Sequence, residues 1–319
     1  MLTAAQCEHA RNLLEELGDR IRHAVEGSRR DLSIEQMAEV AAVTEADTIY
    51  GIDKVSEELI LEWLDEHWPA ELACELVMEG LEEERVLPHG VAPVTKLILD
   101  PIDGTRGLMY DKRSAWALAG LALHRGDRTS LQDIQVAVMT ELPTARQTDW
   151  DQLSAIRGGG IRGRRRARPS QATDFSHGFA SFAKFFPQGK ALIAAIEEDF
   201  WAELYGREPG ASPLIFDDQY LSTGGQIYEL STGRDRFVAD IRPLVFEKIG
   251  LKVSLTCHPY DICTAIVLTE LGGIVETPEG RPVDAPLDTV HPVSWIGFAN
   301  EDLARLARPA LHRALKKHL

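Results

Sequence analysis

The sequence predicts an α+β fold, because two helical patterns come first and several short apolar runs then follow without strict strand–helix alternation. Residues 4–28 carry apolar side chains at intervals of three and four, which is typical of an amphipathic helix. A second helical pattern follows Asp53. Four apolar runs come next and are predicted as strands: Cys74–Met78, 97–99, Ala115–Leu123 and Ile134–Leu142.

The second part of the chain mixes both kinds of element. Gly272 and Gly273 form a typical stop for a helix predicted over 261–271. The other predicted elements are helices over 189–205, after 222–225 and at the C-terminus, and strands at 237–241, Ile274–Glu276 and near 296–299. No repeat or low-complexity linker divides the chain. We therefore predict one unit over 1–319, or two closely packed halves that meet near residue 145.

The composition argues against several classes of partner and location. The formal net charge is −16 over 319 residues, which disfavours nucleic acid as a partner. No stretch approaches the roughly 18 uninterrupted apolar residues of a membrane span, so no membrane partner is expected. The charged, helical N-terminus is unlike a signal peptide. Four scattered cysteines without a CxxC pair fit reduced thiols, which predicts a cytoplasmic protein.

The strongest functional signal is a pair of acids, Asp100 and Asp103, directly after an apolar run. Pro101 fixes its own φ and holds the preceding residue extended, and the turn that follows can bring both carboxylates to one point. Oxygen ligands of this kind suit a hard cation such as Mg²⁺. Gly104 permits close approach of the backbone, so its amide and that of Thr105 could bind phosphate oxygens. The plain alternative is a strand that ends in a Pro-Asp-Gly turn.

A different phosphatase family offers a rival interpretation of the same segment. Haloacid-dehalogenase-type phosphatases also place two acids after an apolar strand, but one residue separates their acids. Two residues separate Asp100 from Asp103. Since side chains alternate along an extended chain, the two spacings aim the acids differently, and we discount that family.

Further acids follow an order that resembles a known family. Glu79 follows the first predicted strand, Asp53 precedes the second helix, and Asp261 lies in a His-Pro-Tyr-Asp segment. Together with Asp-Pro-Ile-Asp-Gly-Thr, Ser-Thr-Gly at 222–224 and Glu-Leu-Gly-Gly at 270–273, this order resembles the inositol monophosphatase superfamily of Mg²⁺-dependent, lithium-sensitive phosphatases. The resemblance covers nearly the whole chain. It implies a layered α/β sandwich of the sugar-phosphatase type.

The resemblance also implies a role for each matched residue. Glu79, Asp100 and the Ile102 carbonyl would hold one metal ion, and Asp100, Asp103 and Asp261 a second, in a set of two or three Mg²⁺ ions. Asp53, Thr105 and Glu79 would surround the attacking water as catalytic residues. The substrate would contact Asp103, Gly104, Thr105, Gly224, Gly225, Gln226 and Asp240. Residues 1–145 would be the metal-binding half and 146–319 the substrate-side half, and a homodimer is expected.

The predicted function is that of a Mg²⁺-dependent phosphomonoesterase in which metal-activated water attacks a small phosphorylated substrate. Gln226 donates and accepts hydrogen bonds and Asp240 accepts them, which favours the hydroxyls of an inositol or similar polyol monophosphate. Bisphosphonucleotide phosphatase and fructose-1,6-bisphosphatase stay open as alternatives, because 157–190 and 240–261 are longer than in short inositol monophosphatases. A non-catalytic relative that binds phosphate ligands is the alternative outside the enzymes.

Two other features favour structural interpretations. The arginine run at 162–168 is predicted to be a solvated loop, although it is the only candidate platform for a nucleotide base. His258 is predicted to be structural, because carboxylates are abundant enough to bind a metal without it.

Overall fold

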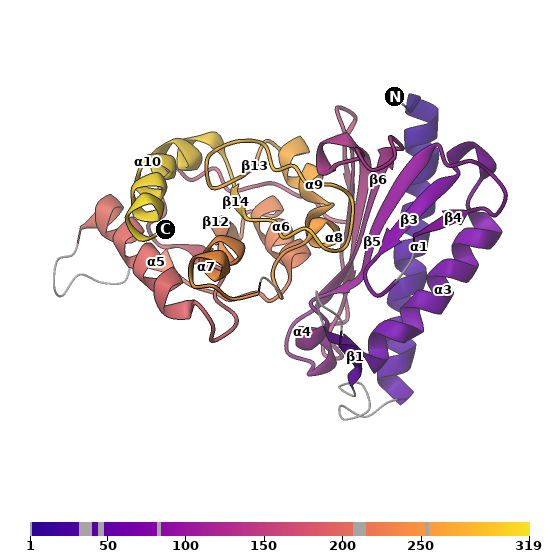
Figure 1. The fold of residues 1–319 in the computed structure, drawn as a ribbon, viewed down its shortest axis with the longest axis horizontal. Helices are drawn as coiled ribbons and strands as arrows, with labels where there is room; N and C mark the ends of the chain where they lie inside the picture. Colours follow the sequence, from indigo (N-terminus) through magenta and orange to yellow (C-terminus); the bar gives the residue numbers. More distant parts are fainter. Residues whose placement is uncertain (1, 32–39, 44–47, 82–83, 207–214, 253–254) are drawn as a thin grey trace.

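The structure is a computed structural model of the chain that describes residues 2–31, 40–43, 48–81, 84–206, 215–252 and 255–319. Within these residues, two mixed sheets and three sets of helices are stacked in layers (Figure 1). This arrangement confirms the predicted α+β class and the layered sandwich.

The first sheet has seven strands among the described residues. Their spatial order is β4 (Arg85–Leu87), β3 (Cys74–Met78), β5 (Thr95–Asp103), β6 (Ala115–Leu123), β7 (Ile134–Leu142), β8 (Gln152–Ile156) and β9 (Gly160–Gly163). The strand that carries both motif acids, β5, lies inside the sheet, and all nine of its residues are buried. Along it, Leu97 and Leu99 face one core and Ile98 faces another, as the alternation of an extended chain requires.

Helices α1 (Ala4–Asp31) and α3 (Gly51–His67) cover the outer face of this sheet (Figure 1). The buried stripe of α1 includes Leu14, Leu17 and Ile21, in agreement with the predicted amphipathic helix. At Gly18 a β-carbon would lie 2.1 Å from the Thr140 hydroxyl oxygen, so the glycine permits the close approach of α1 to β7. None of the helices described is both long enough and apolar enough to cross a membrane.

The second sheet has five strands among the described residues. Their order is β11 (Ile215–Phe216), β10 (Gly178–Phe182), β12 (Asp235–Asp240), β14 (Trp295–Phe298) and β13 (Ile274–Glu276). Helices α5 (Lys190–Tyr205) and α10 (Glu301–His318) contact each other and cover its outer face (Figure 1). A small two-stranded sheet of β1 (Val40–Val43) and β2 (Thr48–Tyr50) lies apart from both.

The middle layer is made by α6 (Thr223–Ser231), α8 (Pro259–Ile262) and α9 (Ala265–Glu270). Helices α6 and α9 contact strands of both sheets, and α8 contacts β5, β6 and α6. One continuous apolar core runs through this layer and includes Ile98 of the first sheet and Phe237 of the second. Two short helices, α4 (Thr105–Met109) and α7 (Arg242–Lys248), complete the region where the sheets meet. The site described below lies in this region.

Several predicted boundaries were wrong. The strand predicted at 97–99 continues to Asp103, and the helix predicted over 261–271 is interrupted at Cys263 and Thr264. The first sheet continues beyond residue 145 to Gly163, and the division into two packed halves stays a prediction. Strands β8, β9 and β10 were not predicted, because their mixed polar and glycine-containing sequences lack a clear apolar run.

Candidate active site

The two motif acids are brought together by a bulge at the end of β5. Asp100 pairs with Leu118 and Asp103 pairs with Trp116, so β5 has one residue more than β6 across this interval. Residues three positions apart on a regular strand face opposite sides, whereas an extra residue re-aims the chain. Pro101 has no amide hydrogen to lose from the ladder. The Ile102 amide instead donates to Oδ1 of Asp100 at 3.0 Å, which fixes the bulge.

Asp103 is buried and accepts three hydrogen bonds from the start of α6. The Ser222 hydroxyl and the Gly224 amide donate to its Oδ2 at 2.8 and 2.5 Å, and the Thr223 amide donates to its Oδ1 at 3.3 Å. A β-carbon at Gly224 would lie 2.6 Å from a Leu118 methyl, so only glycine lets the helix come this close. The Ser-Thr-Gly segment thus positions a motif acid across the boundary between the layers.

Asp261 is positioned by its own helix. It lies in the first turn of α8, where its Oδ2 accepts from the backbone amide of His258 at 2.6 Å. The His258 ring is buried and lies parallel to the ring of Tyr260, with centroids 5.3 Å apart. His258 is therefore a packing and capping residue, and the group of potential metal-binding side chains within the described residues does not include it.

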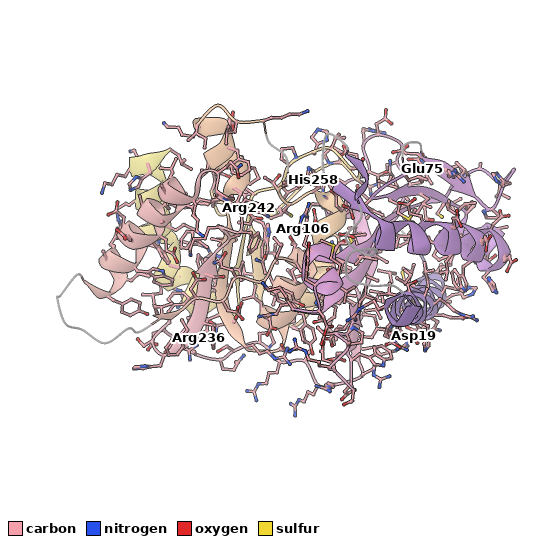
Figure 2. The ribbon with its side chains drawn as sticks, turned by 90° about the horizontal axis from the view of Figure 1, so that it is seen from below. Asp19, Glu75, Arg106, Arg236, Arg242 and His258 are labelled. Carbon is pink, nitrogen blue, oxygen red and sulfur yellow. The ribbon has the colours of Figure 1, made fainter. Side chains whose placement is uncertain are left out.

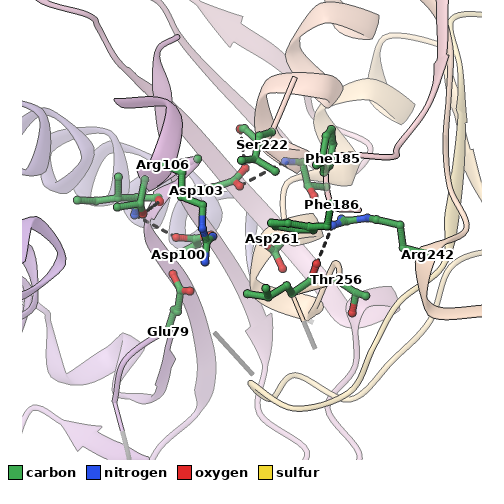
Figure 3. A pocket seen from close by; sticks show the side chains of 16 residues that line it. Glu79, Asp100, Asp103, Arg106, Phe185, Phe186, Ser222, Arg242, Thr256 and Asp261 are labelled. Carbon is green, nitrogen blue, oxygen red and sulfur yellow. Dashed lines mark hydrogen bonds between the residues drawn. The ribbon is translucent and has the colours of Figure 1, made fainter. Parts of the chain in front are cut away.

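Asp100, Asp103 and Asp261 converge. Each offers a carboxylate oxygen, and the three oxygens lie within 4.8 Å of one another (Figure 3). Glu79, which directly follows β3, lines the same cavity and points at the acids from the side of the first sheet. Burial raises the pKa of Asp100 well above its usual range, and the charges of Glu79, Asp103 and Asp261 raise it further.

The donor set fits a divalent cation. Burial, and then the charge of Asp261, raise the pKa of Asp103 to about 8, although bonds from Gly224, Ser222 and Thr223 lower it in part. Carboxylates this close together are stable only when some of them are protonated or when a cation balances their negative charge. Oxygen-only ligands are typical of Mg²⁺ and similar hard cations. The residues present could therefore hold such an ion.

The remaining motif residues also line the cavity: Ile102, Gly104 and Thr105. The Thr105 hydroxyl donates to the Ile102 carbonyl at 2.7 Å, which orients that oxygen and leaves it a second lone pair. Gly104 has φ of 96°, a left-handed conformation that favours glycine, and a β-carbon there would lie 3.0 Å from that of Ser222. The tight turn after β5 therefore depends on this glycine.

Of the other predicted site residues, one has a side chain that the structure does not describe and four do not line the cavity. Asp53 lies in α3, but its side chain is outside the part of the chain that the structure describes. The Gly225 amide donates to the Ser222 hydroxyl, and the Gln226 side-chain amide donates to the Tyr220 carbonyl at 3.0 Å. Asp240 is fully buried and binds Arg242 with both carboxylate oxygens. None of Gly224, Gly225, Gln226 and Asp240 is among the residues that line this cavity.

The residues of this cavity that were not predicted include Arg106, Arg242, Phe185 and Phe186. In Figure 2, Arg106 and Arg242 lie near each other in the middle of the molecule, whereas Arg236 lies towards its edge. Arg106 directly follows the motif threonine, which was a usable signal. Nothing local in the sequence marks Phe185, Phe186 or Arg242, because the fold alone brings them to the acids.

The arginine run lies outside this cavity and is exposed as predicted, but it begins on strand β9 and is therefore only in part the predicted loop. Arg162 pairs with Glu8 and Glu15 of α1, and Arg165 pairs with Asp149. Arg164 lies over the Trp150 ring, 3.9 Å from its centroid. These arginines are thus bound to α1 and to the segment before β8, and none of them lines the acid cavity.

Among the comparisons with known proteins, only the comparison of three-dimensional structures supports the resemblance to the inositol monophosphatase superfamily, and it supports it for the fold. No protein-family profile and no curated protein sequence matches the chain. The extragenic suppressor protein SuhB of Bartonella henselae superposes with a TM-score of 0.68 at 18% identity, over 97% of this chain and 98% of that one. SuhB of Mycobacterium tuberculosis gives 0.65 at 15% identity, over 97% of each chain. The inositol monophosphatase from Anabaena gives 0.63 at 15% identity, over 99% of this chain and 98% of that one. Over nearly its whole length, the protein therefore has the fold of the inositol monophosphatase and SuhB structures.

Proposed function

We propose that this protein is a metal-dependent phosphomonoesterase that uses water to cleave a small phosphate ester. The observation that carries the proposal is the convergence of Asp100, Asp103 and Asp261 beside Glu79 in one cavity. Bound divalent cations, Mg²⁺ by the chemistry of the donors, would supply the positive charge that a phosphate requires and would acidify a water molecule. The fold shared with inositol monophosphatase structures supports the same reaction class.

The protein's own groups then have distinct tasks. Asp100, Asp103, Asp261 and the Ile102 carbonyl bind the cations. Glu79 lies at the edge of the acid group and is our candidate for accepting the proton of the attacking water, with Asp53 and Thr105 as further catalytic candidates. The backbone amides of Gly104 and Thr105, at the turn after β5, are our candidates for binding phosphate oxygens. Phosphoryl transfer depends mainly on positioning and electrostatic stabilisation, and this set needs no covalent nucleophile.

The substrate is proposed here as a small phosphorylated molecule. The polyol hypothesis depended on Gln226 and Asp240 as hydroxyl ligands. Gln226 donates instead to Tyr220, and both oxygens of Asp240 bind Arg242. The two contacts on which the inositol monophosphate hypothesis depended are therefore absent, and the bisphosphorylated substrates become relatively more favoured. A homodimer in the cytoplasm stays a prediction.

The test is phosphate release from a set of phosphate monoesters with Mg²⁺, and after addition of a chelator in excess. Activity is expected with Mg²⁺, lost on chelation and restored by further Mg²⁺. Asp261→Asn should lose activity, whereas Asp288→Asn, on a loop away from the cavity, should keep it. Full activity in excess chelator would exclude the metal mechanism. Phosphate binding without turnover of any ester would favour the non-catalytic alternative.

A further inference from the structure

A second cavity, separate from the acid cavity, has no part in the proposed function. It lies between the loop after α4, the end of β7 with the loop that follows it, and α6 with the residues on either side (Figure 1). Its volume is about 590 Å³, within the range of about 300–1,000 Å³ that is typical of small-molecule sites. The cavity is therefore large enough for a ligand of its own.

The charge of this cavity is opposite in sign to that of the whole chain. Five cationic side chains line it: Lys112, Arg113, Arg146, Arg165 and Arg234. Three carboxylates line it as well: Glu141, Asp149 and Glu229. The formal balance is five minus three, or +2, in a chain whose net charge is −16. Burial also raises the pKa of Glu229, although Arg234 and Arg113 lower it in part, so this carboxylate accepts a proton more easily when an anion binds beside it.

The ion pairs of these cations are weak enough to be exchanged for a ligand. Arg165 pairs with Asp149, and both side chains are half exposed or more. Lys112 is exposed, and its ammonium group has no ion pair in the described part of the chain. The other pairs are also partly exposed: Arg113 with Asp218 and Glu229, Arg146 with Asp111, and Arg234 with Glu229. Exposed pairs contribute only about 0–1 kcal/mol each, so an anion with several charges can replace one carboxylate at little cost.

Two of the arginines are already oriented by aromatic rings. The Cζ atom of Arg113 lies 4.1 Å from the centre of the Tyr220 ring, and that of Arg234 lies 5.0 Å from the centre of the Tyr228 ring. Both tyrosines are buried. A guanidinium that lies over a ring keeps its N–H donors at its edge, where they can bind phosphate oxygens. Less ordering is then required of these side chains when an anion binds.

Tyr220 also connects this cavity with the acid cluster. Its hydroxyl accepts from the Trp116 indole nitrogen at 2.9 Å, and Trp116 lies opposite Asp103 in the ladder between β5 and β6. Its ring lies against α6, since a β-carbon at Gly225 would lie 2.4 Å from it. Tyr220 is two residues before Ser222, whose hydroxyl donates to Asp103. A ligand that shifts Tyr220 would therefore disturb two neighbours of Asp103.

We propose that this cavity binds a small anion with two or more phosphate groups, and that the bound anion regulates the acid cluster through Tyr220. The regulatory part rests on the proposed function, whereas the binding part does not. Several phosphate groups are required, because a single phosphate reaches few of the cations that surround a cavity of this volume. The proposal also gives a role to the arginine run, since Arg165 belongs to that run and lines the cavity.

The binding experiment titrates metal-free protein with inorganic triphosphate in a calorimeter, in the presence of a chelator. Without metal, the acid cluster repels anions, so binding reports on the second cavity. One site per chain is expected at an ionic strength of about 0.15 M, and added salt should weaken it. Orthophosphate should bind about tenfold more weakly or less, because it contacts fewer cations. Adenosine triphosphate, titrated in parallel, shows whether a base adds affinity.

The test variant is Lys112→Gln combined with Arg165→Gln. Both side chains are exposed, so folding should be unaffected, and the loss of two charges should weaken triphosphate binding by about tenfold or more. The matched control is Arg128→Gln combined with Arg281→Gln. It also removes two exposed charges, and neither residue lines the cavity. Equal affinity in the test variant and the control would overturn the proposed site.

The regulatory part is tested by hydrolysis of p-nitrophenyl phosphate with free Mg²⁺ held at saturation, because triphosphate itself binds Mg²⁺. Triphosphate should change kcat of the wild-type protein on the order of fivefold or more, and should change that of the test variant much less. An effect on KM alone that the test variant retains would indicate competition at the acid cavity and would overturn the regulation.

The outcomes separate the proposals. If the wild-type protein hydrolyses no ester, the proposed function and the regulation fail together, and calorimetry decides the binding site independently. If folded wild-type protein does not bind triphosphate, the site is overturned. Binding without a change in kcat overturns the regulation alone. A short single-stranded RNA that binds more tightly than triphosphate, and less tightly to the test variant, would assign the surface to nucleic acid and overturn the proposal.

Discussion

The Ser222 hydroxyl donates to Oδ2 of Asp103 at 2.8 Å, although the two residues are 119 positions apart in the chain. The serine oxygen also accepts from the Gly225 amide at 2.8 Å and so caps α6. Asp103 therefore belongs to two structures at once, the acid cluster on β5 and the beginning of a helix in the middle layer. The site and the packing between the two sheets share this residue.

Ser222→Ala should destabilise the protein by about 1.5–3 kcal/mol, because it removes a buried bond to a charged group and a helix cap. Denaturant unfolding measures the change. The control is Ser231→Ala in the same helix, since Ser231 is fully buried and its hydroxyl has no partner within the described residues. The control should change stability by about 0.5 kcal/mol or less. Equal losses in both variants would contradict a specific role for Ser222.

Asp103→Asn should lower kcat at saturating Mg²⁺ on the order of 10²-fold or more, because a charged ligand is removed from the site. From the sequence alone, the variant is expected to fold, because Asp103 is predicted at a turn and not in the core. Asp103 is instead buried and accepts three bonds, so a loss of stability is also expected. Steady-state kinetics and denaturant unfolding measure the two effects.

The matched control for Asp103→Asn is Asp151→Asn. Asp151 is 1% exposed and accepts from Tyr228, Gln152 and Arg165, but it is outside the acid cavity. Its substitution should lower stability and leave kcat near the wild-type value. A similar fall in kcat for both variants would mean that disturbed folding, and not a lost ligand, explains the effect.

Mg²⁺ binding should strengthen as pH rises. The pKa of Asp103 is raised to about 8 and that of Asp100 is also raised, mainly by burial, so part of the acid cluster is protonated at neutral pH before metal binds. A cation requires ionised ligands, and each binding event should release protons. Calorimetric titration at pH 7 in buffers of different ionisation enthalpy measures the release. An affinity independent of pH between 6 and 8.5 would contradict the raised pKa values.

Gly120→Ala should disturb the acid cluster indirectly, through residues that pack next to it. A β-carbon at Gly120 of β6 would lie 3.0 Å from the Cys263 β-carbon and 3.0 Å from an Ile134 methyl. Overpacking of this kind costs about 1–3 kcal/mol, and a shift of Cys263 should also weaken Mg²⁺ binding through nearby Asp261. Gly27→Ala in α1 is the control, because nothing lies within 4 Å of its added carbon. The control should instead gain about 0.5–1 kcal/mol.

The parts of the fold that could be predicted are those with local signals. The strands Cys74–Met78, Ala115–Leu123 and Ile134–Leu142 have the predicted bounds, because each is a mainly apolar run and nearly all of its residues are buried. β10 contains only five residues and begins with glycine, so its place between β11 and β12 depends on tertiary packing. The bulge in β5 is likewise set by pairing with β6, which periodicity along one strand does not reveal.

The same distinction applies to the site. Asp100, Asp103 and Asp261 could be predicted because short, dense motifs surround them, and the structure brings their oxygens together. The sequence could not show whether Asp240 is free to bind a substrate, because both of its carboxylate oxygens accept hydrogen bonds from the Arg242 side chain. From its residue type alone, Asp240 could bind a substrate hydroxyl. In the structure it instead holds the Arg242 guanidinium in place.

The bond between Ser222 and Asp103 has a consequence for synthesis on the ribosome. The strands of the first sheet are complete once residue 163 has emerged, so that sheet can begin to form on a nascent chain. Its two acids then still lack the α6 donors and Asp261, which are translated much later. The acid cluster is therefore among the last features to be assembled, and products that terminate early carry Asp100 and Asp103 without Asp261.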